Sequence, residues 1–327
     1  MKKTIILSIA LVCALISCGK NTANNSSVKA ENQVQENRDW LKEVVIEKEL
    51  LYDQHTLADS YPYKDTVRVF QWDKIRKHLA IVDSIQESPA IWGILQNKSN
   101  EYGDPPKARN FKINEYHSVT DVYGIEGSQN VPLYLPTDSI VPERYGLDGS
   151  LVKIINDGTD FVEVSTIYFP GNWIIPKKYV DVIQDNVSFK KVAVVDRNNQ
   201  NIATLEKVDD KWLVRSMNPA TTGAHHPPYE KPTPLGIFVI QEKREKMFFY
   251  GDGNTIIEGF APYANRFCDG GYIHGVPVNL PHKDIIEFSP TLGTIPRSHM
   301  CVRTAASHAK FIYDWAPINN SLVIVLE

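Results

Sequence analysis

Cysteine is scarce in this chain, and after the N-terminus no apolar run approaches membrane-spanning length. The 327 residues hold four cysteines, and two of these, Cys13 and Cys18, lie in the first 18 positions. Only Cys268 and Cys301 follow, and two cysteines are too few to build a structural zinc site. A helix that crosses a bilayer needs about 20 predominantly apolar residues. The rest of the chain therefore gives no reason to expect a transmembrane helix.

The chain also lacks an excess of positive charge. Lys and Arg number 35 against 39 Asp and Glu, which gives a formal net charge of −4. No basic tail or basic repeat is present, so nucleic acid is not expected as a partner. The hydrophobic content of 43% is that of an ordinary globular protein. The 310 residues from Cys18 to Glu327 suggest two or more domains.

The N-terminus has the features of a targeting segment. Lys2 and Lys3 precede a short apolar run, Ile5–Ile16. The run ends at Ser17 and Cys18, which resembles a lipobox, in which the cysteine is lipidated and becomes N-terminal after cleavage. We therefore predict a lipoprotein signal peptide over residues 1–17 and lipidation of Cys18. An ordinary secretory signal with a chance cysteine is the alternative.

The next segment, residues 18–38, has the composition of a tether. It is rich in Asn, Ser, Lys, Gln and Glu and has almost no large apolar residue, so it cannot bury enough surface to fold. Lipid chains on Cys18 would anchor the protein to a membrane surface without spanning it. Lys20 is not an obvious inner-membrane retention residue. The expected location is therefore exported and lipid-anchored, at an outer membrane facing the periplasm.

Residues 39–118 are predicted to form a helical N-terminal region. Asp39 is a capping residue type, and residues 72–85 repeat with helical spacing. Glycine and prolines at 103–106 end the pattern. No residue in this region suggests chemistry. The helical face over 72–85 would hold Trp72, Ile75, Leu79, Val82 and Ile85.

Residues 119–187 change to short strands. Alternating or apolar runs at 131–134, 151–155 and 161–165 are separated by turn residues. The closing segment WIIPKKYV, residues 173–180, resembles the last strands of bacterial SH3-like barrels. That resemblance implies an SH3-like β-barrel, for which binding to the cell wall is one role. Alternatively, the aromatic residues of this segment only fill a core.

Residues 188–327 are also predicted to be mainly β. Strands at 191–196 and 202–206 flank a turn, and the last strand covers 321–326. A helix is expected at 305–315, before the last of these strands. Just before this helix the chain reads RSHMCVR over 297–303, and upstream it reads GGYIHG over 270–275. A thiol has a pKa of about 8.5 and needs a nearby base or cation to act as a nucleophile, so these two segments form a candidate Cys/His site.

These segments resemble the signature of the YkuD-type L,D-transpeptidases, which is His-Gly, a spacer and Ser-His-Gly-Cys-Ile-Arg. PTPLGIF at 232–238 is similar to a second element of that family. The resemblance covers 188–327 and implies a β-sandwich catalytic domain with a short helix after the nucleophile. The chain departs from the pattern at Met300, which replaces a glycine. Its spacer is also longer, and residues 276–294 are expected to form a flap over the site.

The resemblance also implies roles for individual residues. Cys301 would be the nucleophile and His274 its general base, with Gly275 allowing a backbone carbonyl to orient the imidazole ring. Backbone N–H groups around Met300 and Cys301 would form the oxyanion hole. Arg303 would hold a substrate carboxylate, with a local salt bridge as the alternative. The remaining supporting or substrate-binding residues would be Ser298 and His299.

Several other readings of the same residues are open. A Cys268–Cys301 disulfide is possible in an exported protein. His282, in the long spacer, is a reserve candidate for the base. The adjacent His225 and His226 lie in a proline-rich segment and are expected to be a loop rather than a metal site. No metal or organic cofactor is expected.

The function that the resemblance implies is peptidoglycan L,D-transpeptidation. Cys301 would form a thioester with a tetrapeptide stem, and an amine on a neighbouring stem would resolve it to give a 3–3 cross-link. Carbapenem-type β-lactams would acylate Cys301. The alternatives are an L,D-carboxypeptidase that trims tetrapeptide to tripeptide, attachment or release of a wall protein, and a catalytically inactive wall-binding scaffold.

Overall fold

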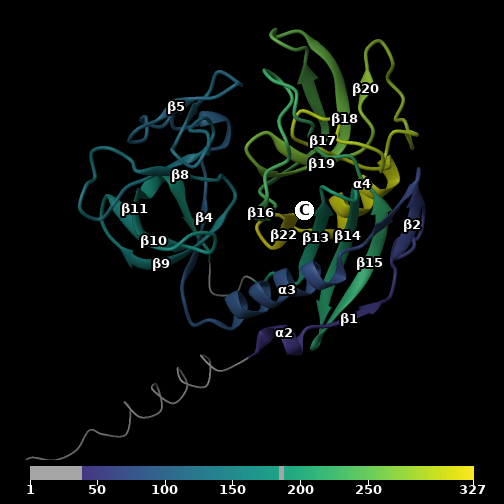
Figure 1. Cartoon of the computed structure of the whole chain (residues 1–327), viewed down its shortest axis with the longest axis horizontal. Helices are drawn as coiled ribbons and strands as arrows, with labels where there is room; N and C mark the ends of the chain where they lie inside the picture. The colour runs from purple at the N-terminus through teal and green to yellow at the C-terminus, as the bar shows by residue number, and fades with distance from the viewer. Residues whose placement is uncertain (1–38, 184–187) are drawn as a thin grey trace, which may run out of the picture. The chain divides into compact units, whose positions relative to one another are not determined.

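A six-stranded mixed sheet organises the C-terminal part of the protein. The structure is a computed structural model, and it describes residues 39–183 and 188–327. The predicted signal peptide, Cys18 and the tether up to residue 38 lie outside the described residues. Figure 1 shows the sheet in the order β1-β15-β14-β13-β22-β16. Its strands are β1 (Val45–Lys48), β13 (Lys191–Asp196), β14 (Asn201–Val208), β15 (Lys211–Pro219), β16 (Gly236–Val239) and β22 (Ser321–Leu326).

The apolar run of the last strand explains its place in this sheet. All six residues of β22 are buried, and the strand pairs in parallel with β13 and antiparallel with β16. A strand that is covered on both faces has a continuous apolar sequence rather than an alternating one. The strands predicted at 191–196, 202–206 and 321–326 are confirmed.

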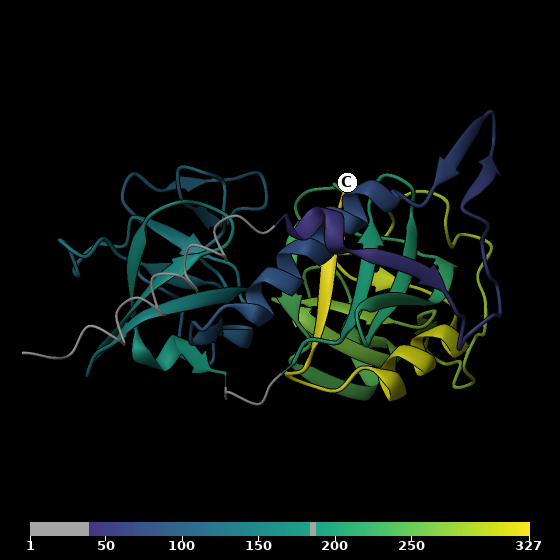
Figure 2. The same cartoon turned by 90° about the horizontal axis from the view of Figure 1, so that it is seen from below.

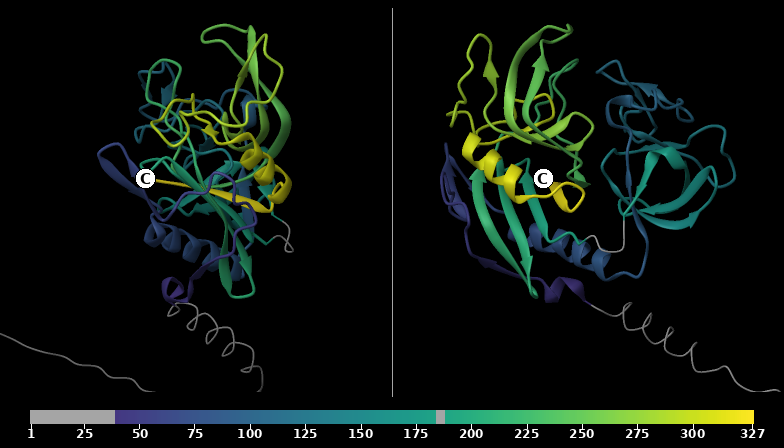
Figure 3. Two further views of the ribbon diagram at one scale, coloured as in Figure 1. Left: turned by 90° about the vertical axis from the view of Figure 1, so that its right-hand side faces the viewer. Right: turned by 180° about the vertical axis from the view of Figure 1, so that it is seen from behind.

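A second sheet packs on one face of the first. It has the order β17-β18-β19-β21, with β20 paired to β18. Phe238 and Val323 of the first sheet share a buried cluster with Ile273 and Val302 of the second. The view from behind in Figure 3 shows the second sheet above the first, with α4 beside them. The elements are β17 (Glu242–Tyr250), β18 (Ile257–Cys268), β19 (Gly271–His274), β20 (Val278–Asn279), β21 (Val302–Arg303) and α4 (Ala306–Trp315).

One long helix, α3 (Trp72–Glu87), covers the other face of the six-stranded sheet (Figure 2). Ile75, Leu79, Val82 and Ile85 of the predicted helical face are buried, and Trp72, the fifth residue of that face, is partly buried against the same core. They belong to one core cluster with Trp212 and other residues of β13, β14 and β15. The helix therefore supports the six-stranded sheet on the face opposite to the second sheet. In the part of the chain that the structure describes, no helix is long and apolar enough to cross a membrane.

The helical character predicted for 39–118 is not confirmed beyond α3 and one short helix. That short helix is α2 (Trp40–Glu43). The segment otherwise contains strands, and β1 pairs in parallel with β15 at the edge of the large sheet. Tertiary pairing decides the state of such short segments, because an unpaired sheet edge offers backbone hydrogen bonds to any extended chain. The other strands before 118 are β2 (Ser60–Tyr63), β3 (Thr66–Val69), β4 (Trp92–Leu95) and β5 (Lys112–Ile113).

The middle module has its own core and a five-stranded sheet in the order β11-β10-β9-β4-β12. Its end strands do not pair with each other, so the residues that the structure describes form no closed barrel, and the SH3-like barrel is not confirmed. One reason is that β4, from before residue 119, lies between β9 and β12. The module strands are β6 (Val119–Thr120), β7 (Val131–Leu133), β8 (Arg144–Gly146), β9 (Leu151–Asp157), β10 (Phe161–Thr166), β11 (Asn172–Pro176) and β12 (Val180–Val182).

Candidate active site

The pairing of β19 with β21 brings the two sequence motifs together. The strands are parallel, with Ile273 opposite Val302 and His274 opposite Arg303. Ile273 and Val302 are fully buried in the core between the sheets. Because side chains alternate along a strand, His274, Cys301 and Arg303 lie on the opposite face. All three line one cavity.

This cavity has a volume of about 900 Å³ and is open to solvent along the second sheet. Of the predicted site residues, His274, Ser298, His299, Cys301 and Arg303 line it, whereas Gly275 and Met300 are not among the lining residues. The spacer predicted as a flap forms one wall. Its lining residues are Val276, Pro277, Asn279, Ser289, Thr291 and Leu292, and strand β17 supplies Met247, Phe248, Phe249 and Tyr250.

His274 is buried and held in one orientation. Its Nδ1 lies 2.6 Å from the carbonyl oxygen of Gly275. A carbonyl only accepts, so Nδ1 carries the proton and Nε2 has a free lone pair. Burial lowers the pKa of His274 to about 4. The hydrogen bond to Gly275 acts to raise this pKa, whereas the positive charge of Arg303 lowers it further. At neutral pH the imidazole is uncharged and is able to accept a proton.

Cys301 rests as a protonated thiol. Its Sγ donates to the carbonyl oxygen of Gly270 at 3.4 Å, and the backbone N–H of Tyr272 donates to the sulfur. Burial raises the pKa of the thiol, which outweighs the lowering by the Tyr272 N–H and by Arg303. The site therefore holds a neutral thiol and a neutral imidazole on one wall, rather than a preformed thiolate and imidazolium.

Cys268 and Cys301, the two cysteines among the residues that the structure describes, are both free. Cys268 is fully buried behind the site, and burial raises the pKa of its thiol well above the ordinary value. The alternative of a Cys268–Cys301 disulfide is therefore wrong for this structure. Cys268 is a packed thiol in the core between the two sheets.

A threonine that the sequence analysis did not single out fixes the loop before Cys301. Thr233 Oγ1 donates to the carbonyl oxygen of Met300 at 2.7 Å and accepts from the N–H of Gly223 at 2.9 Å. Ser298 Oγ donates to the carbonyl oxygen of Cys301 within the same loop. Thr233 belongs to the PTPLGIF element, so the second family-like motif acts on the site through this hydroxyl. Only the spatial closeness of residues 233 and 300 reveals it.

Replacing Thr233 by valine should destabilise the protein and slow alkylation of Cys301. Valine has nearly the same shape but leaves the Gly223 N–H and the Met300 carbonyl without a partner, at about 1–3 kcal/mol per buried group. Urea unfolding and the rate of reaction with iodoacetamide measure the two effects. Thr233→Ser keeps the hydroxyl and is the control. Equal stability of the two variants would contradict this role.

The polar residues around the cavity differ in their surroundings. His299 is exposed, and its Nε2 lies 2.7 Å from Asp252 Oδ1. Within the ranges 39–183 and 188–327, Arg303 forms no ion pair, and its buried Nε has no partner. The alternative of a local salt bridge for Arg303 is therefore not seen. A guanidinium that lines a cavity and forms no ion pair is suited to hold a ligand carboxylate.

The remaining histidine candidates lie outside the cavity lining. His282 is exposed and does not line the cavity. His225 Nδ1 contacts the hydroxyl of Tyr116 at 2.7 Å, and His226 pairs with Glu230 at 2.5 Å. In the described part of the chain, no group of three or more His, Cys, Asp or Glu side chains could hold a metal ion.

Comparison with known proteins gives one family. Residues 190–325 match the model of the L,D-transpeptidase catalytic domain, YkuD. This range contains His274, Cys301 and every other residue that lines the cavity. A search of the curated proteins found no match.

Solved structures give weaker similarities. A fused Zn-dependent amidase/peptidase/peptidoglycan-binding domain-containing protein from Clostridium acetobutylicum is 20% identical, over 42% of this chain and 52% of that one, with a TM-score of 0.31. The chain thus spans about half the length of that protein. An L,D-transpeptidase from Mycobacterium tuberculosis is 19% identical over 57% and 70%, with a TM-score of 0.33. One from Mycobacterium smegmatis is 16% identical over 55% and 93%, with a TM-score of 0.35. Sequence identities and TM-scores this low add nothing to the family match of residues 190–325.

Proposed function

We propose that this protein, whose residues 190–325 match the L,D-transpeptidase catalytic domain, cross-links peptidoglycan stems through a thioester on Cys301. The observation that carries the proposal is the parallel register of β19 and β21. It supports a shared task for His274 and Cys301, because both side chains line the same cavity. The cavity is also large enough for a peptide, since small-ligand sites span about 300–1,000 Å³.

The first half-reaction is acylation. Nε2 of His274 takes the thiol proton, and the sulfur attacks the carbonyl carbon of the diamino acid at position three of a tetrapeptide stem. A carbon–sulfur bond forms while the bond to the nitrogen of D-alanine breaks. The proton held on His274 passes to that nitrogen, so D-alanine leaves as a neutral amine. Backbone N–H groups around Met300 and Cys301 stabilise the oxyanion between these steps.

The second half-reaction is resolution of the thioester. An amine of a neighbouring stem attacks the thioester carbonyl, and His274 accepts the proton that this amine loses. The carbon–sulfur bond breaks, and the proton returns to Cys301. The product is a 3–3 cross-link, and the enzyme regains its neutral pair.

We assign substrate-binding roles to Arg303 and His299. The guanidinium of Arg303 lies in the cavity wall and is free to hold a stem carboxylate through two parallel hydrogen bonds. Its charge also favours the thiolate that forms during attack, since it already lowers the pKa of Cys301. His299, paired with Asp252, presents a polar edge at the exposed side of the cavity.

Incubation of the protein with purified disaccharide-tetrapeptides, followed by mass spectrometry, tests this function. We expect a cross-linked dimer and released D-alanine, and neither product with Cys301→Ala. A carbapenem should add to the wild-type protein at Cys301 and leave the alanine variant unmodified. Tripeptide alone would show that water is the acceptor, which makes the protein an L,D-carboxypeptidase. No product and no adduct would favour an inactive wall-binding scaffold.

A further inference from the structure

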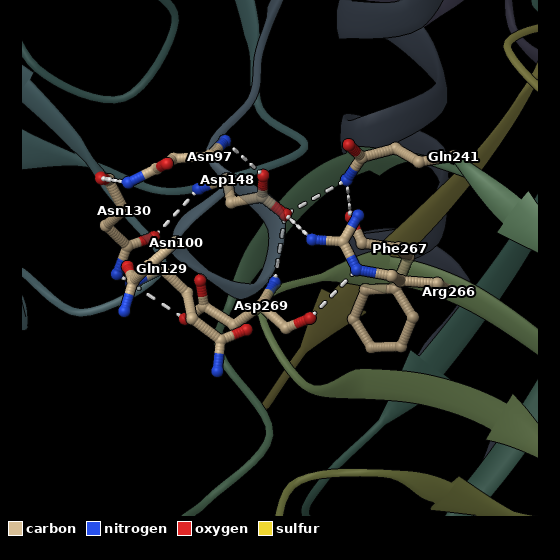
Figure 4. A network of polar contacts seen from close by, with 9 residues as sticks. All are labelled: Asn97, Asn100, Gln129, Asn130, Asp148, Gln241, Arg266, Phe267 and Asp269. Atoms are coloured by element: carbon tan, nitrogen blue, oxygen red, sulfur yellow. Dashed lines mark hydrogen bonds and ion pairs between the residues drawn. The ribbon is translucent and has the colours of Figure 1, made fainter. Parts of the chain in front are cut away.

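A fully buried carboxylate lies where the middle module meets the proposed catalytic segment, residues 190–325. Asp148, in the connection from β8 to β9, has an exposed fraction of 0%. Its Oδ1 accepts from the backbone N–H of Asn97 at 2.8 Å. Its Oδ2 accepts from Arg266 Nη2, from Gln241 Nε2 at 3.2 Å and from the backbone N–H of Asp269 at 3.1 Å. Figure 4 shows Asp148 at the centre of this network.

Three of these four donors belong to the catalytic segment. Gln241 precedes β17, Arg266 lies in β18, and Asp269 begins the turn from β18 to β19. Arg266 also donates from Nε to the carbonyl oxygen of Asp269 at 3.0 Å (Figure 4). Asp148 and Arg266 thus hold both backbone polar groups of Asp269. Asp269 has φ +31°, a conformation that L-residues rarely adopt, so the turn depends on these contacts.

The same turn holds the thiol of Cys301. Asp269 is followed by Gly270, whose carbonyl oxygen accepts from Cys301 Sγ at 3.4 Å. Tyr272, two residues later, donates its N–H to the sulfur. The residue that Asp148 contacts, Asp269, is therefore directly followed by the residue whose carbonyl oxygen contacts Cys301. Gly149, beside Asp148, approaches the turn so closely that an added Cβ would lie 2.0 Å from the carbonyl oxygen of Phe267.

We propose that Asp148 of the middle module is a positioning residue of the active site, which acts through Arg266 and the 268–271 turn to fix the thiol of Cys301. The middle module is then a built-in part of the catalytic machinery. This inference deepens the proposed function, because a positioned thiol matters most for acyl transfer. The reactivity of the Cys301 thiol, on which the inference depends, is measurable without any peptidoglycan substrate.

The charges around the network fit this role. Burial is the main cause that raises the pKa of Asp269 to about 8, and the negative charges of Asp148 and Glu126 act in the same direction. The positive charges of Arg266 and Lys231 lower this pKa but do not outweigh the other effects. At neutral pH Asp269 is therefore protonated. Burial also raises the pKa of Asp148, and the charge of Arg266 opposes this effect. Because Arg266 donates directly to Asp148, we assign the one carboxylate of the network to Asp148, facing the guanidinium of Arg266. A variant that neutralises Asp148 leaves Arg266 buried without a counter-ion, whereas Asp269→Asn leaves the charge balance unchanged.

The test compares Asp148→Asn with the parent as full-length protein. The alkylation rate of Cys301 with iodoacetamide is measured against pH, with Cys301→Ala as the background. The carbonyl oxygen of Gly270 accepts from the protonated thiol and so favours that form, and a loosened turn should move the midpoint of the alkylation profile down toward the ordinary thiol value. Acylation by a carbapenem should slow about 10- to 100-fold at saturating drug, with little change in the concentration for half-maximal rate.

Tyr168→Phe is the matched control for the same boundary. Its hydroxyl donates to the carbonyl oxygen of Ile237 at 2.6 Å and accepts from the N–H of the same residue, so its hydrogen bonds join the module to β16. This variant should lose stability and keep the parent's alkylation profile. A double variant, Asp148→Asn with Arg266→Gln, covers the case in which Asp148→Asn fails to fold. It leaves no buried charge alone, and it should show the same shift in midpoint.

The outcomes separate the two proposals. A shifted midpoint without any cross-linking by the parent protein would support the positioning role and remove the proposed function. Cross-linking by the parent, with an unchanged alkylation profile and acylation rate in a folded Asp148 variant, would overturn the positioning role alone. A merely structural Asp148 would lower the unfolding midpoint and leave the thiol profile where it was.

Discussion

Replacing His274 by glutamine should slow acylation of Cys301 by a carbapenem about 10²- to 10⁴-fold, the usual contribution of a general base. Glutamine is similar in size and retains a donor for the carbonyl of Gly275, but it cannot accept a proton. Stopped-flow fluorescence or mass spectrometry of the adduct measures the rate. Alkylation by iodoacetamide at high pH is the internal control, because hydroxide then supplies the thiolate. An acylation rate within a few-fold of the parent would exclude His274 as the base.

The pH dependence of the acylation rate tests the same role of His274. The pKa of His274 is lowered to about 4, so the imidazole is neutral, and competent as a base, above that value. The titration of His274 should therefore leave the acylation rate unchanged near neutral pH and lower it only as the pH drops through about 4. An exposed histidine would lose its function near its ordinary pKa of about 6.5. A limb near pH 6.5 that disappears in His274→Gln would contradict the buried, neutral state described above.

Replacing Trp212 by alanine should lower the free energy of unfolding by about 3–5 kcal/mol, as for other buried large aromatics. Trp212, in β15, is 0% exposed and packs between the six-stranded sheet and α3. Its Nε1 donates to Asp83 Oδ2 of α3 at 3.2 Å. The change removes both the packing and this link. Urea unfolding followed by far-UV circular dichroism measures the loss.

Trp212→Phe separates packing from hydrogen bonding. Phenylalanine keeps most of the apolar contact and loses only the donor to Asp83, which still pairs with Lys207 at 2.9 Å. We expect a loss of about 1–2 kcal/mol for this variant. If the alanine and phenylalanine variants unfolded at the same urea concentration, the contact between α3 and the sheet would not depend on the indole volume.

The sequence predicted the parts of the site that are local in the chain. His274 and Cys301 were predicted from two short motifs, and the structure places the carbonyl oxygen of the adjacent Gly275 2.6 Å from Nδ1 of the histidine. Strands such as β22 and the buried face of α3 were predicted because their apolar spacing is strong. In each case the signal lies within about 30 residues.

The parts that the sequence did not predict depend on distant partners. β1 is a strand because β15, more than 160 positions away, offers an edge to pair with. β4 completes the sheet of the middle module from outside the predicted boundary. The contact between Asp148 and Arg266 joins residues 118 positions apart, and nothing in either segment alone indicates its partner. Thr233 was quoted within a motif, but its contact with Met300 also appears only in three dimensions.

The position of β22 has a consequence for the timing of folding. The last strand in sequence lies inside the six-stranded sheet, between β13 and β16. While a ribosome is still producing residues 321–326, the two neighbouring strands have no partner on that side, and the sheet stays divided. Closing contacts between residues 191–196 and 321–326 is a slow, long-range step. A chain interrupted before residue 321 would expose the apolar edges of β13 and β16 and be prone to aggregate.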